Sequence, residues 1–187
     1  MNAAEQIRDD GGDYVRGRRD LKPLMSSADQ TWNTPDWFIE RLRSALGPIG
    51  LDPCSNEWSV VNAATEFRFD HGQDGLALPW RGHGLTFVNS PFGRALFAWA
   101  DKWSSDGDEV VALEPSRTDT AWWQLAVTRC AAYVQWRGRF EFRLRTGKRG
   151  NAPFPSTVFY YGSRTDAFLA EFARSGHAVR MPERRPR

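Results

Sequence analysis

The fold is decided by residues 84–113, whose sequence is GLTFVNSPFGRALFAWADKWSSDGDEVVAL. Residues 84–89 are mostly apolar and of strand length, residues 95–103 repeat apolar side chains at helical spacing, and residues 109–113 are a second apolar run. A strand, a helix and another strand at this spacing indicate a βαβ unit, in which the two strands are parallel. The stretch therefore predicts an α/β fold.

The same alternation extends to both sides of this stretch. On the N-terminal side, Thr34 is predicted to cap a helix that has Pro35 at its first position and ends at Gly47. A short strand at 49–52 follows, and the chain from there to Trp80 has no regular pattern. Together these elements predict a Rossmann-like, mostly parallel sheet flanked by helices. The elements expected further on are helices at about 119–129 and 166–174, strands at 157–161 and 178–181, and one long strand or two short ones within 131–142.

The length and composition fit a single folded domain. A chain of 187 residues can form one well-packed core but is short for two ordinary domains. Residues 1–29 are polar and charged and predict a flexible arm, residues 30–182 predict the domain, and residues 183–187 form a basic tail. Nine Trp and twelve Phe indicate a packed chain, and we expect most of them in the core rather than on a surface that stacks nucleobases.

Cysteine, histidine and hydropathy patterns exclude several classes of protein. Cys54 and Cys130 lie far apart in no metal-ligand pattern, and the chain has only three His, so we expect no metal. The sequence has neither an apolar run of membrane-spanning length nor a signal-peptide pattern. We therefore expect a cytoplasmic protein with reduced thiols and no membrane partner.

Positive charge is concentrated in one segment although the formal net charge is only +2. A basic stripe of this kind suits a phosphate backbone, but a run of charges is also common on an ordinary solvated surface. Both interpretations stay open at this point. Six cations lie here against the single acid Glu141, namely Arg137, Arg139, Arg143, Arg145, Lys148 and Arg149.

The tetrapeptide Asn89-Ser90-Pro91-Phe92 follows a predicted strand, and ligands in α/β sheets bind at the carboxyl ends of strands. An amine on a nucleobase is a poor nucleophile because its lone pair is conjugated with the ring. Two acceptors, the Asn89 side-chain oxygen and the Ser90 carbonyl, favour a more tetrahedral nitrogen. Pro91 restricts Ser90 to extended geometry, and Phe92 offers a ring face to a base that has left the helix. The alternative is an ordinary turn.

An ordered series of short motifs resembles the phage-type DNA N6-adenine methyltransferases, often called the phage Dam family. The tetrapeptide is similar to the Asn/Asp-Pro-Pro-Tyr/Phe motif of amino-methyltransferases. The resemblance covers roughly residues 31–162. Its other motifs are Trp32-Asn33-Thr34-Pro35, Leu51 to Asn56, Asp74-Gly75-Leu76 with Trp80, Pro115 to Trp123, Gly138-Arg139-Phe140 and Asn151 to Ser156.

The resemblance implies a cofactor, S-adenosyl-L-methionine, and residues that bind it. It places Thr34-Pro35 near the cofactor carboxylate, Asp52 near its amino group, and Asp74 on its adenine. Asp74 is also an ordinary turn residue before Gly75. Cys54 and Asn56 lie in the loop after the first strand, which here has no glycine, and Ser90 stands where the family more commonly has Pro.

Arg117 and five cations of the basic segment are expected to bind double-stranded DNA. Arg117 follows a strand and precedes a helix, where it can reach a phosphate or the target nucleotide, although Thr118 or Asp119 can also act there as a helix cap. The mixture of basic and aromatic side chains from 137 to 149 suits a segment lying along a duplex. The DNA-binding residues predicted from this segment are Arg139, Arg143, Arg145, Lys148 and Arg149.

The sequence therefore predicts an S-adenosylmethionine-dependent DNA methyltransferase that acts on the N6 amine of adenine without a metal. Asn89, Ser90, Pro91 and Phe92 are its predicted catalytic residues. The chain has no large inserted recognition domain, which favours short or relaxed specificity, and a monomer is plausible. The alternatives are another planar amine, such as cytosine N4, an RNA adenine or a protein glutamine, and a DNA-binding module without catalysis.

Overall fold

The structure is a computed structural model and describes residues 32–144 and 149–182. The predicted N-terminal arm at 1–29 and the predicted basic tail at 183–187 lie outside the described residues, as do Arg145 and Lys148. All the described residues belong to one unit of the chain. Within them, no helix is both long enough and apolar enough to cross a bilayer.

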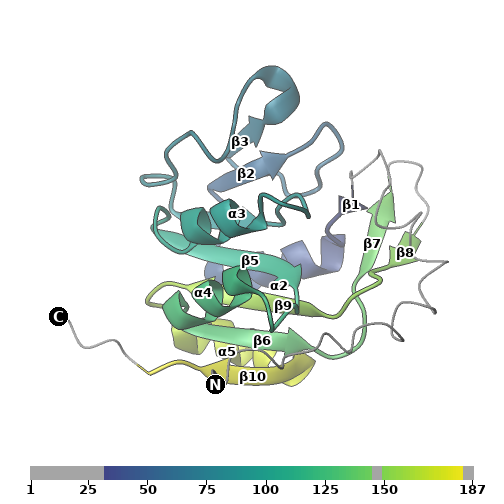
Figure 1. Cartoon of the computed structure of the whole chain (residues 1–187), viewed down its shortest axis with the longest axis vertical. Helices are drawn as coiled ribbons and strands as arrows, with labels where there is room; N and C mark the ends of the chain where they lie inside the picture. Colours follow the sequence, from purple (N-terminus) through teal and green to yellow (C-terminus); the bar gives the residue numbers. More distant parts are fainter. Residues whose placement is uncertain (1–31, 145–148, 183–187) are drawn as a thin grey trace, which may run out of the picture. The chain divides into compact units, whose positions relative to one another are not determined.

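Seven strands form one sheet at the centre of the fold (Figure 1). In chain order they are β2 Leu51–Ser55, β3 Thr65–Arg68, β4 Leu85–Val88, β5 Glu109–Pro115, β6 Ala132–Trp136, β9 Ser156–Tyr161 and β10 Gly176–Arg180. Their order across the sheet is β10-β6-β9-β5-β4-β2-β3. The pairs β3–β2, β2–β4 and β4–β5 are parallel, whereas β9 is antiparallel to β5 and β6, and β10 to β6. Five strands thus share one direction, which confirms the predicted Rossmann-like sheet.

Helices of the described part of the chain cover both faces of this sheet (Figure 1). On one face are α2 Asp36–Leu46 and α5 Thr165–Phe172, which continues into a short 3₁₀ turn at Ala173–Ser175, and on the other are α3 Leu96–Trp103 and α4 Ala121–Arg129. Successive residues of β5 alternate between the two layers, so that Val111 and Leu113 pack with the first pair, and Val110 and Ala112 with the second. The central strands are therefore buried on both faces, as their continuous apolar runs predict.

Most of the aromatic side chains lie in the core, as the composition predicts. The face covered by α3 and α4 is packed largely by tryptophan, with Trp80, Trp99, Trp103, Trp122 and Trp123 all buried. The core on the face covered by α2 and α5 contains no buried tryptophan among the described residues. Its buried aromatic side chains are Tyr160 and the phenylalanines Phe38, Phe87, Phe140, Phe142, Phe168 and Phe172. The large apolar side chains that stay exposed among the described residues are Trp37, Trp58, Phe69 and Phe97.

A second sheet of three short strands was not predicted. It contains β1 Trp32–Asn33, β7 Glu141–Leu144 and β8 Arg149–Asn151, in the antiparallel order β1-β7-β8. The segment 131–142 therefore forms two short strands, of which β6 stays in the main sheet and β7 leaves it. The chain changes direction between them near Gly138, whose φ of 81° is favourable for glycine.

Helix α2 begins at Asp36, so the prediction that Thr34 caps it and that Pro35 is helical was wrong. Pro35 precedes the helix in an extended conformation, with φ −60° and ψ 137°, and makes no capping side-chain hydrogen bond. The cause is the pairing of Asn33 with Arg143 in the small sheet, which keeps the chain extended up to the helix. Gly47 ends the helix as predicted.

Strand β2 continues beyond its predicted end at Asp52, and the supposedly irregular chain before Trp80 contains β3. Ser55 pairs with Arg68 of β3, after a shift in register between Asp52 and Ser55. Strand β3 lies at the edge of the sheet and buries only Phe67, which explains why its polar sequence lacks an apolar pattern.

Candidate active site

Three neighbouring strands bring polar side chains to one edge of the sheet. Asp52 lies in β2, Asn89 directly follows β4, and Glu114 is the penultimate residue of β5. Strand β4 is the parallel neighbour of both β2 and β5, so the carboxyl ends of all three meet. This is the edge of an α/β sheet at which ligands bind.

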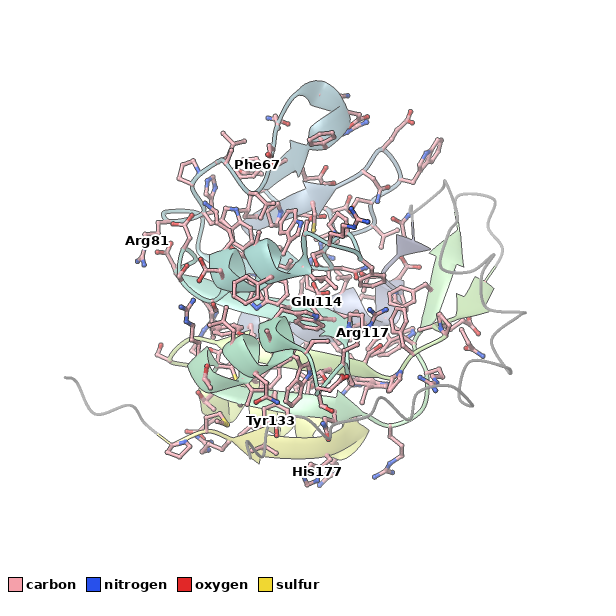
Figure 2. All side chains as sticks on the ribbon, in the orientation of Figure 1. Phe67, Arg81, Glu114, Arg117, Tyr133 and His177 are labelled. Carbon is pink, nitrogen blue, oxygen red and sulfur yellow. The ribbon has the colours of Figure 1, made fainter. Side chains whose placement is uncertain are left out.

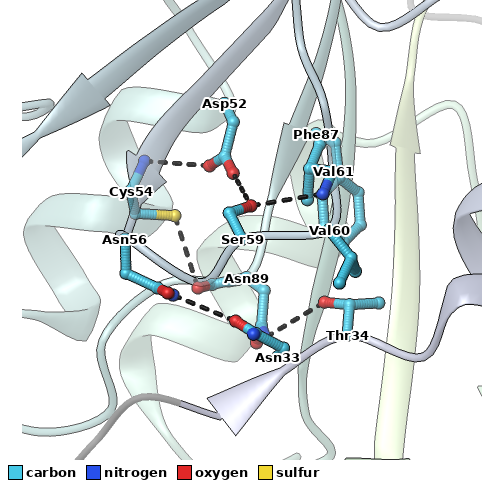
Figure 3. Close-up of a pocket in the computed structure, with 10 residues that line it drawn as sticks. All are labelled: Asn33, Thr34, Asp52, Cys54, Asn56, Ser59, Val60, Val61, Phe87 and Asn89. Carbon is cyan, nitrogen blue, oxygen red and sulfur yellow. Dashed lines mark hydrogen bonds between the residues drawn. The ribbon is translucent and has the colours of Figure 1, made fainter. Parts of the chain in front are cut away.

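A small cavity lies at this edge (Figure 3). Its volume is about 30 Å³, which is room for roughly one water molecule. A second cavity of about 330 Å³ adjoins it, and the two share Ser59 and Val60 in their walls. The first cavity brings together five of the predicted site residues, Thr34, Asp52, Cys54, Asn56 and Asn89, and is completed by Asn33, Ser59, Val60, Val61 and Phe87.

Asp52 is buried in the cavity wall and accepts two hydrogen bonds. One carboxylate oxygen accepts from the backbone N–H of Cys54 and the other from the Ser59 hydroxyl, both at 3.1 Å. Burial raises the pKa of Asp52 from 3.8 to about 7, against the opposing effect of these hydrogen bonds. A cationic ligand in the cavity would favour the charged form of this carboxyl.

The amide side chain of Asn89 donates one hydrogen bond through its nitrogen, whereas its oxygen accepts none from the described residues. Its Nδ2 donates to the Thr34 hydroxyl at 3.3 Å, so Thr34 orients Asn89 instead of capping helix α2. Asn89 Oδ1 is buried and has no hydrogen-bond partner among the residues that the structure describes. An unpaired buried acceptor is unfavourable by about 1–3 kcal/mol. A donor that entered the cavity could form a hydrogen bond with this oxygen.

A network of amide side chains closes the cavity on the side of the small sheet. Asn33 Nδ2 donates to the backbone oxygen of Trp58, and Asn56 Nδ2 donates to Asn33 Oδ1 at 3.1 Å. The backbone N–H of Trp58 donates in turn to Asn56 Oδ1 at 2.9 Å. The network ties β1 to the loop that follows β2 and holds that loop over the cavity.

Cys54 serves as a hydrogen-bond donor in this site. Its thiol donates to the backbone oxygen of Asn89 at 3.3 Å, and burial raises the pKa of the thiol well above its ordinary 9.0, which keeps the proton on sulfur. Neither Cys54 nor Cys130 is in a disulfide. Within the described ranges, no group of three or more His, Cys, Asp or Glu side chains is arranged to hold a metal ion.

The last two residues of the tetrapeptide lie nearer the surface than the first two. Pro91 is exposed, and Phe92 is partly buried and meets Phe154 edge to face, with ring centroids 5.0 Å apart and planes at 88°. Ser90 is 3% exposed. The tetrapeptide thus runs from the buried cavity wall to an aromatic pair at the surface.

Asp74 does not line the cavity. It is exposed, and its Oδ1 accepts a hydrogen bond from the Leu76 N–H at 2.9 Å, which is the turn geometry that the sequence also allows. A Cβ atom on Gly75 would lie 1.9 Å from the Pro53 backbone oxygen. Glycine is therefore required for this turn to pack directly on β2.

Comparison with known families identifies the family of the chain. The family model described as DNA N-6-adenine-methyltransferase (Dam) matches residues 23–159. The chain belongs to this family. The match confirms the predicted family, and the matched range includes every residue that lines the first cavity. A comparison with curated proteins found no match.

In this Dam-family chain, Arg117 follows β5 beyond Glu114 (Figure 2). Its side chain makes no hydrogen bond or ion pair with another described residue. Neither Thr118 nor Asp119 caps α4, because Thr120 takes the cap position and its hydroxyl donates to the Arg117 backbone oxygen at 2.7 Å.

The described part of the basic segment divides into paired and unpaired cations. Arg143 pairs with Asp36 at 2.7 Å and Arg149 with Glu141 at 3.2 Å. Arg139 is exposed and has no ion-pair partner among the described side chains. Exposed pairs contribute little, typically about 0–1 kcal/mol, so a DNA phosphate can compete for their cations.

Sequence reasoning missed Glu114, which the structure places against the tetrapeptide. Glu114 is 1% exposed, and its Oε1 accepts a hydrogen bond from the Ser90 N–H at 2.9 Å. Burial raises the pKa of Glu114 from 4.5 to about 8. The available signal was an acid at the end of the apolar run Val110 to Leu113, where a charged side chain is unfavourable unless it has a partner.

Proposed function

We propose that this Dam-family chain transfers the methyl group of S-adenosylmethionine to the N6 amine of an adenine that has left the double helix. Asn89 and the Ser90 carbonyl are proposed to bind that amine. The observation that carries the proposal is the buried, unpartnered Oδ1 of Asn89 beside the cavity. An exocyclic amine supplies the hydrogen that this acceptor lacks.

Asn89 is suited to this task because its amide is fixed at the other end. With Nδ2 bound to the Thr34 hydroxyl, the carbonyl end of the side chain is presented as the acceptor. Acceptors held in place before the reaction can stabilise developing positive charge on nitrogen without reorganising. When the amine gains the methyl group, the bond between that methyl group and the cofactor sulfur breaks, S-adenosylhomocysteine leaves, and the amine loses one proton to water.

The polar groups of the cavity wall suit the amino-acid end of the cofactor. The Asp52 carboxyl suits an ammonium group, and the Ser59 hydroxyl and the Asn56 amide offer further polar contacts. When bound, S-adenosylmethionine supplies an electrophilic methyl group. Pro35, Cys54 and Asp74 are proposed to take part in the same cofactor site.

The whole cofactor is larger than the first cavity, so we propose that this cavity holds only its amino-acid end unless part of the wall moves. Ser59 and Val60 separate this cavity from the larger one beside it. Displacement of this short segment would join the two spaces. The side-chain network of Asn33, Asn56 and Trp58 borders the segment and is the part of the wall that would then have to adjust.

The flipped base is proposed to lie against Phe92. Its edge-on partner Phe154 holds the ring in place, and Pro91 restricts the backbone that joins the ring to Ser90. Arg117 and Arg139, which lack ion-pair partners within the described ranges, are proposed to bind phosphates of double-stranded DNA. Arg143, Arg145, Lys148 and Arg149 are proposed to extend this interface, with short or relaxed sequence specificity.

The central test is Asn89→Ala, assayed by transfer of labelled methyl from S-adenosylmethionine to DNA. We expect transfer to fall by at least a hundredfold, and less with Asn89→Asp, which keeps an acceptor oxygen. Transfer near the wild-type rate by Asn89→Ala would refute the assignment.

Two further measurements separate the alternatives. Mass spectrometry of the digested product distinguishes N6-methyladenine from N4-methylcytosine, and methylation mapping gives the sequence context. Calorimetry with S-adenosylmethionine separates an enzyme from an inactive DNA-binding module, because such a module need not bind the cofactor.

A further inference from the structure

The peptide bond between Asn89 and Ser90 is held from both of its sides. Its carbonyl oxygen accepts the Cys54 thiol hydrogen at 3.3 Å, and its N–H donates to the Glu114 carboxyl at 2.9 Å (Figure 3 shows the first contact). Cys54 comes from β2 and Glu114 from β5, the two strands that flank β4. Three adjacent strands therefore fix one peptide plane.

The hydrogen bond described for the Glu114 carboxyl group is the one from the Ser90 N–H. Its side chain is in the interior (Figure 2), Oε1 receives the Ser90 N–H, and Oε2 has no partner among the described residues. No ion pair with a described cation accounts for the burial of this carboxyl. A buried polar side chain of this kind is unfavourable, so a requirement at the strand end explains its presence better than stability does.

The plane of this peptide determines where both proposed acceptors point. Holding the plane fixes ψ of Asn89 and φ of Ser90, the two torsion angles that set the orientation of the Asn89 side chain relative to the Ser90 carbonyl. Pro91 restricts Ser90 from the other side. The acceptor pair is thus fixed at both of its backbone connections.

We propose that Glu114, together with Cys54, is a positioning residue that holds the Asn89–Ser90 peptide so that the Asn89 side chain and the Ser90 carbonyl can bind the same amine. This inference rests on the proposed function. Glu114 acts through Ser90 and does not touch the base. Its contribution is to the rate of the chemical step rather than to the binding of either substrate.

The test compares two substitutions of Glu114 that differ in one property. Glu114→Gln keeps an oxygen that can accept the Ser90 N–H, whereas Glu114→Met has similar length and no acceptor. We expect Glu114→Met to lower kcat by about tenfold to a hundredfold, with KM for DNA and Kd for S-adenosylmethionine within threefold of wild type. Glu114→Gln is expected to keep kcat within threefold.

Thr86→Val is the matched control. Thr86, like Glu114, is a fully buried polar residue, but it lies within β4, and its hydroxyl has no partner within the described ranges. We expect it to leave kcat unchanged, because it removes a buried polar group without touching the held peptide. If Glu114→Met retains as much activity as Thr86→Val, Glu114 does not position the acceptors.

A second measurement does not depend on activity. Hydrogen exchange of the Ser90 amide should be slow in the wild type and in Glu114→Gln, and at least tenfold faster in Glu114→Met. Equal exchange in all three proteins would overturn the inference. If the wild type transfers no methyl group to DNA, the proposed function fails, while the exchange result still decides whether Glu114 holds this peptide.

If Glu114→Met does not fold, Cys54→Ala tests the other hydrogen bond to the Asn89–Ser90 peptide, the one at its carbonyl oxygen. It removes the donor to the Asn89 carbonyl, and we expect kcat to fall while the Ser90 amide stays protected by Glu114. A Cys54→Ala protein with wild-type kcat would remove Cys54 from the arrangement.

Discussion

Replacing Glu114 with Gln should change how the stability of the fold depends on pH. Burial raises the pKa of Glu114 from its ordinary 4.5 to about 8. Between these two values the folded chain keeps the proton and the unfolded chain releases it. Stability from this group is therefore fully present below pH 4.5 and is lost as pH rises toward 8. Gln resembles the protonated carboxyl but does not titrate.

The size of the effect follows from the two pKa values. One bound proton changes the free energy of unfolding by about 1.4 kcal/mol per pH unit. The stability of Glu114→Gln relative to wild type should therefore rise by about 2.5 kcal/mol between pH 5.5 and pH 7.5. Any effect of the substitution on the free energy of unfolding that is the same at both pH values cancels in this comparison.

Other buried groups near Glu114 do not obscure this comparison. Asp52, whose pKa burial raises to about 7, titrates in both proteins, so its contribution cancels in the difference. Burial raises the pKa of the Cys54 thiol and of the Tyr161 phenol well above their ordinary values of 9.0 and 10.0, outside the window. The change isolates Glu114.

The assay is urea unfolding followed by tryptophan fluorescence at pH 5.5, 6.5 and 7.5, with constant ionic strength. A free-energy difference between the two proteins that stays constant across these pH values would refute the reasoning. Carbon-13 NMR of the Glu114 carboxyl supplies a direct check, because its titration midpoint should lie near pH 8.

Two further expectations concern DNA binding and the packing of the loop before β4. Arg139→Ala should reduce the slope of the logarithm of the DNA-binding constant against the logarithm of the salt concentration by about 1, and leave cofactor affinity unchanged. Fluorescence titrations at several salt concentrations measure this slope, with Arg174→Ala, which is also exposed, as the control. An unchanged slope would remove Arg139 from the interface. Gly75→Ala should destabilise the fold by about 3 kcal/mol or more, since its Cβ would lie 1.9 Å from the Pro53 oxygen, and an unchanged urea midpoint would contradict the packing of this turn on β2.

The central part of the fold was predictable because its strands are buried on both faces. Such strands are continuous apolar runs, and the helices between them repeat apolar residues at helical spacing, as residues 84–113 do. Once parallel neighbours are assigned, the meeting of Asp52 and Asn89 follows from topology. The fold class and this part of the site therefore needed no tertiary information.

The edges of the fold were not predictable in the same way. Strand β3 has a polar sequence because one of its sides meets solvent, and β1 is held by pairing with β7, which lies about a hundred residues further along the chain. Thr34 shows the consequence for the site. Its local sequence predicts a helix cap, but the pairing of Asn33 with Arg143 keeps it extended and directs its hydroxyl to Asn89. Long-range pairing overrides the local preference here.

Away from the site, several buried polar groups of the core have partners within the chain, whereas the Thr86 hydroxyl and the Trp123 indole N–H have none among the described residues. The indole N–H of Trp80 donates to the Gly75 oxygen at 2.7 Å, and that of Trp103 donates to the Tyr161 hydroxyl at 3.1 Å. Such pairing is the rule in folded proteins, because an unpaired buried group is unfavourable.

The exceptions are concentrated where the chemistry is proposed. Six buried side-chain atoms have no partner among the described residues, and four of them belong to Ser55, Asn89, Ser90 and Glu114, at the carboxyl ends of β2, β4 and β5. Each unpaired group lowers the stability of the fold by about 1–3 kcal/mol, so the unfavourable effect of unpaired buried polar atoms is concentrated at this one edge of the sheet. An acceptor that must bind an incoming amine has to be unpaired until the amine arrives. The same vacancy that destabilises the free protein is therefore what the proposed methyl transfer requires.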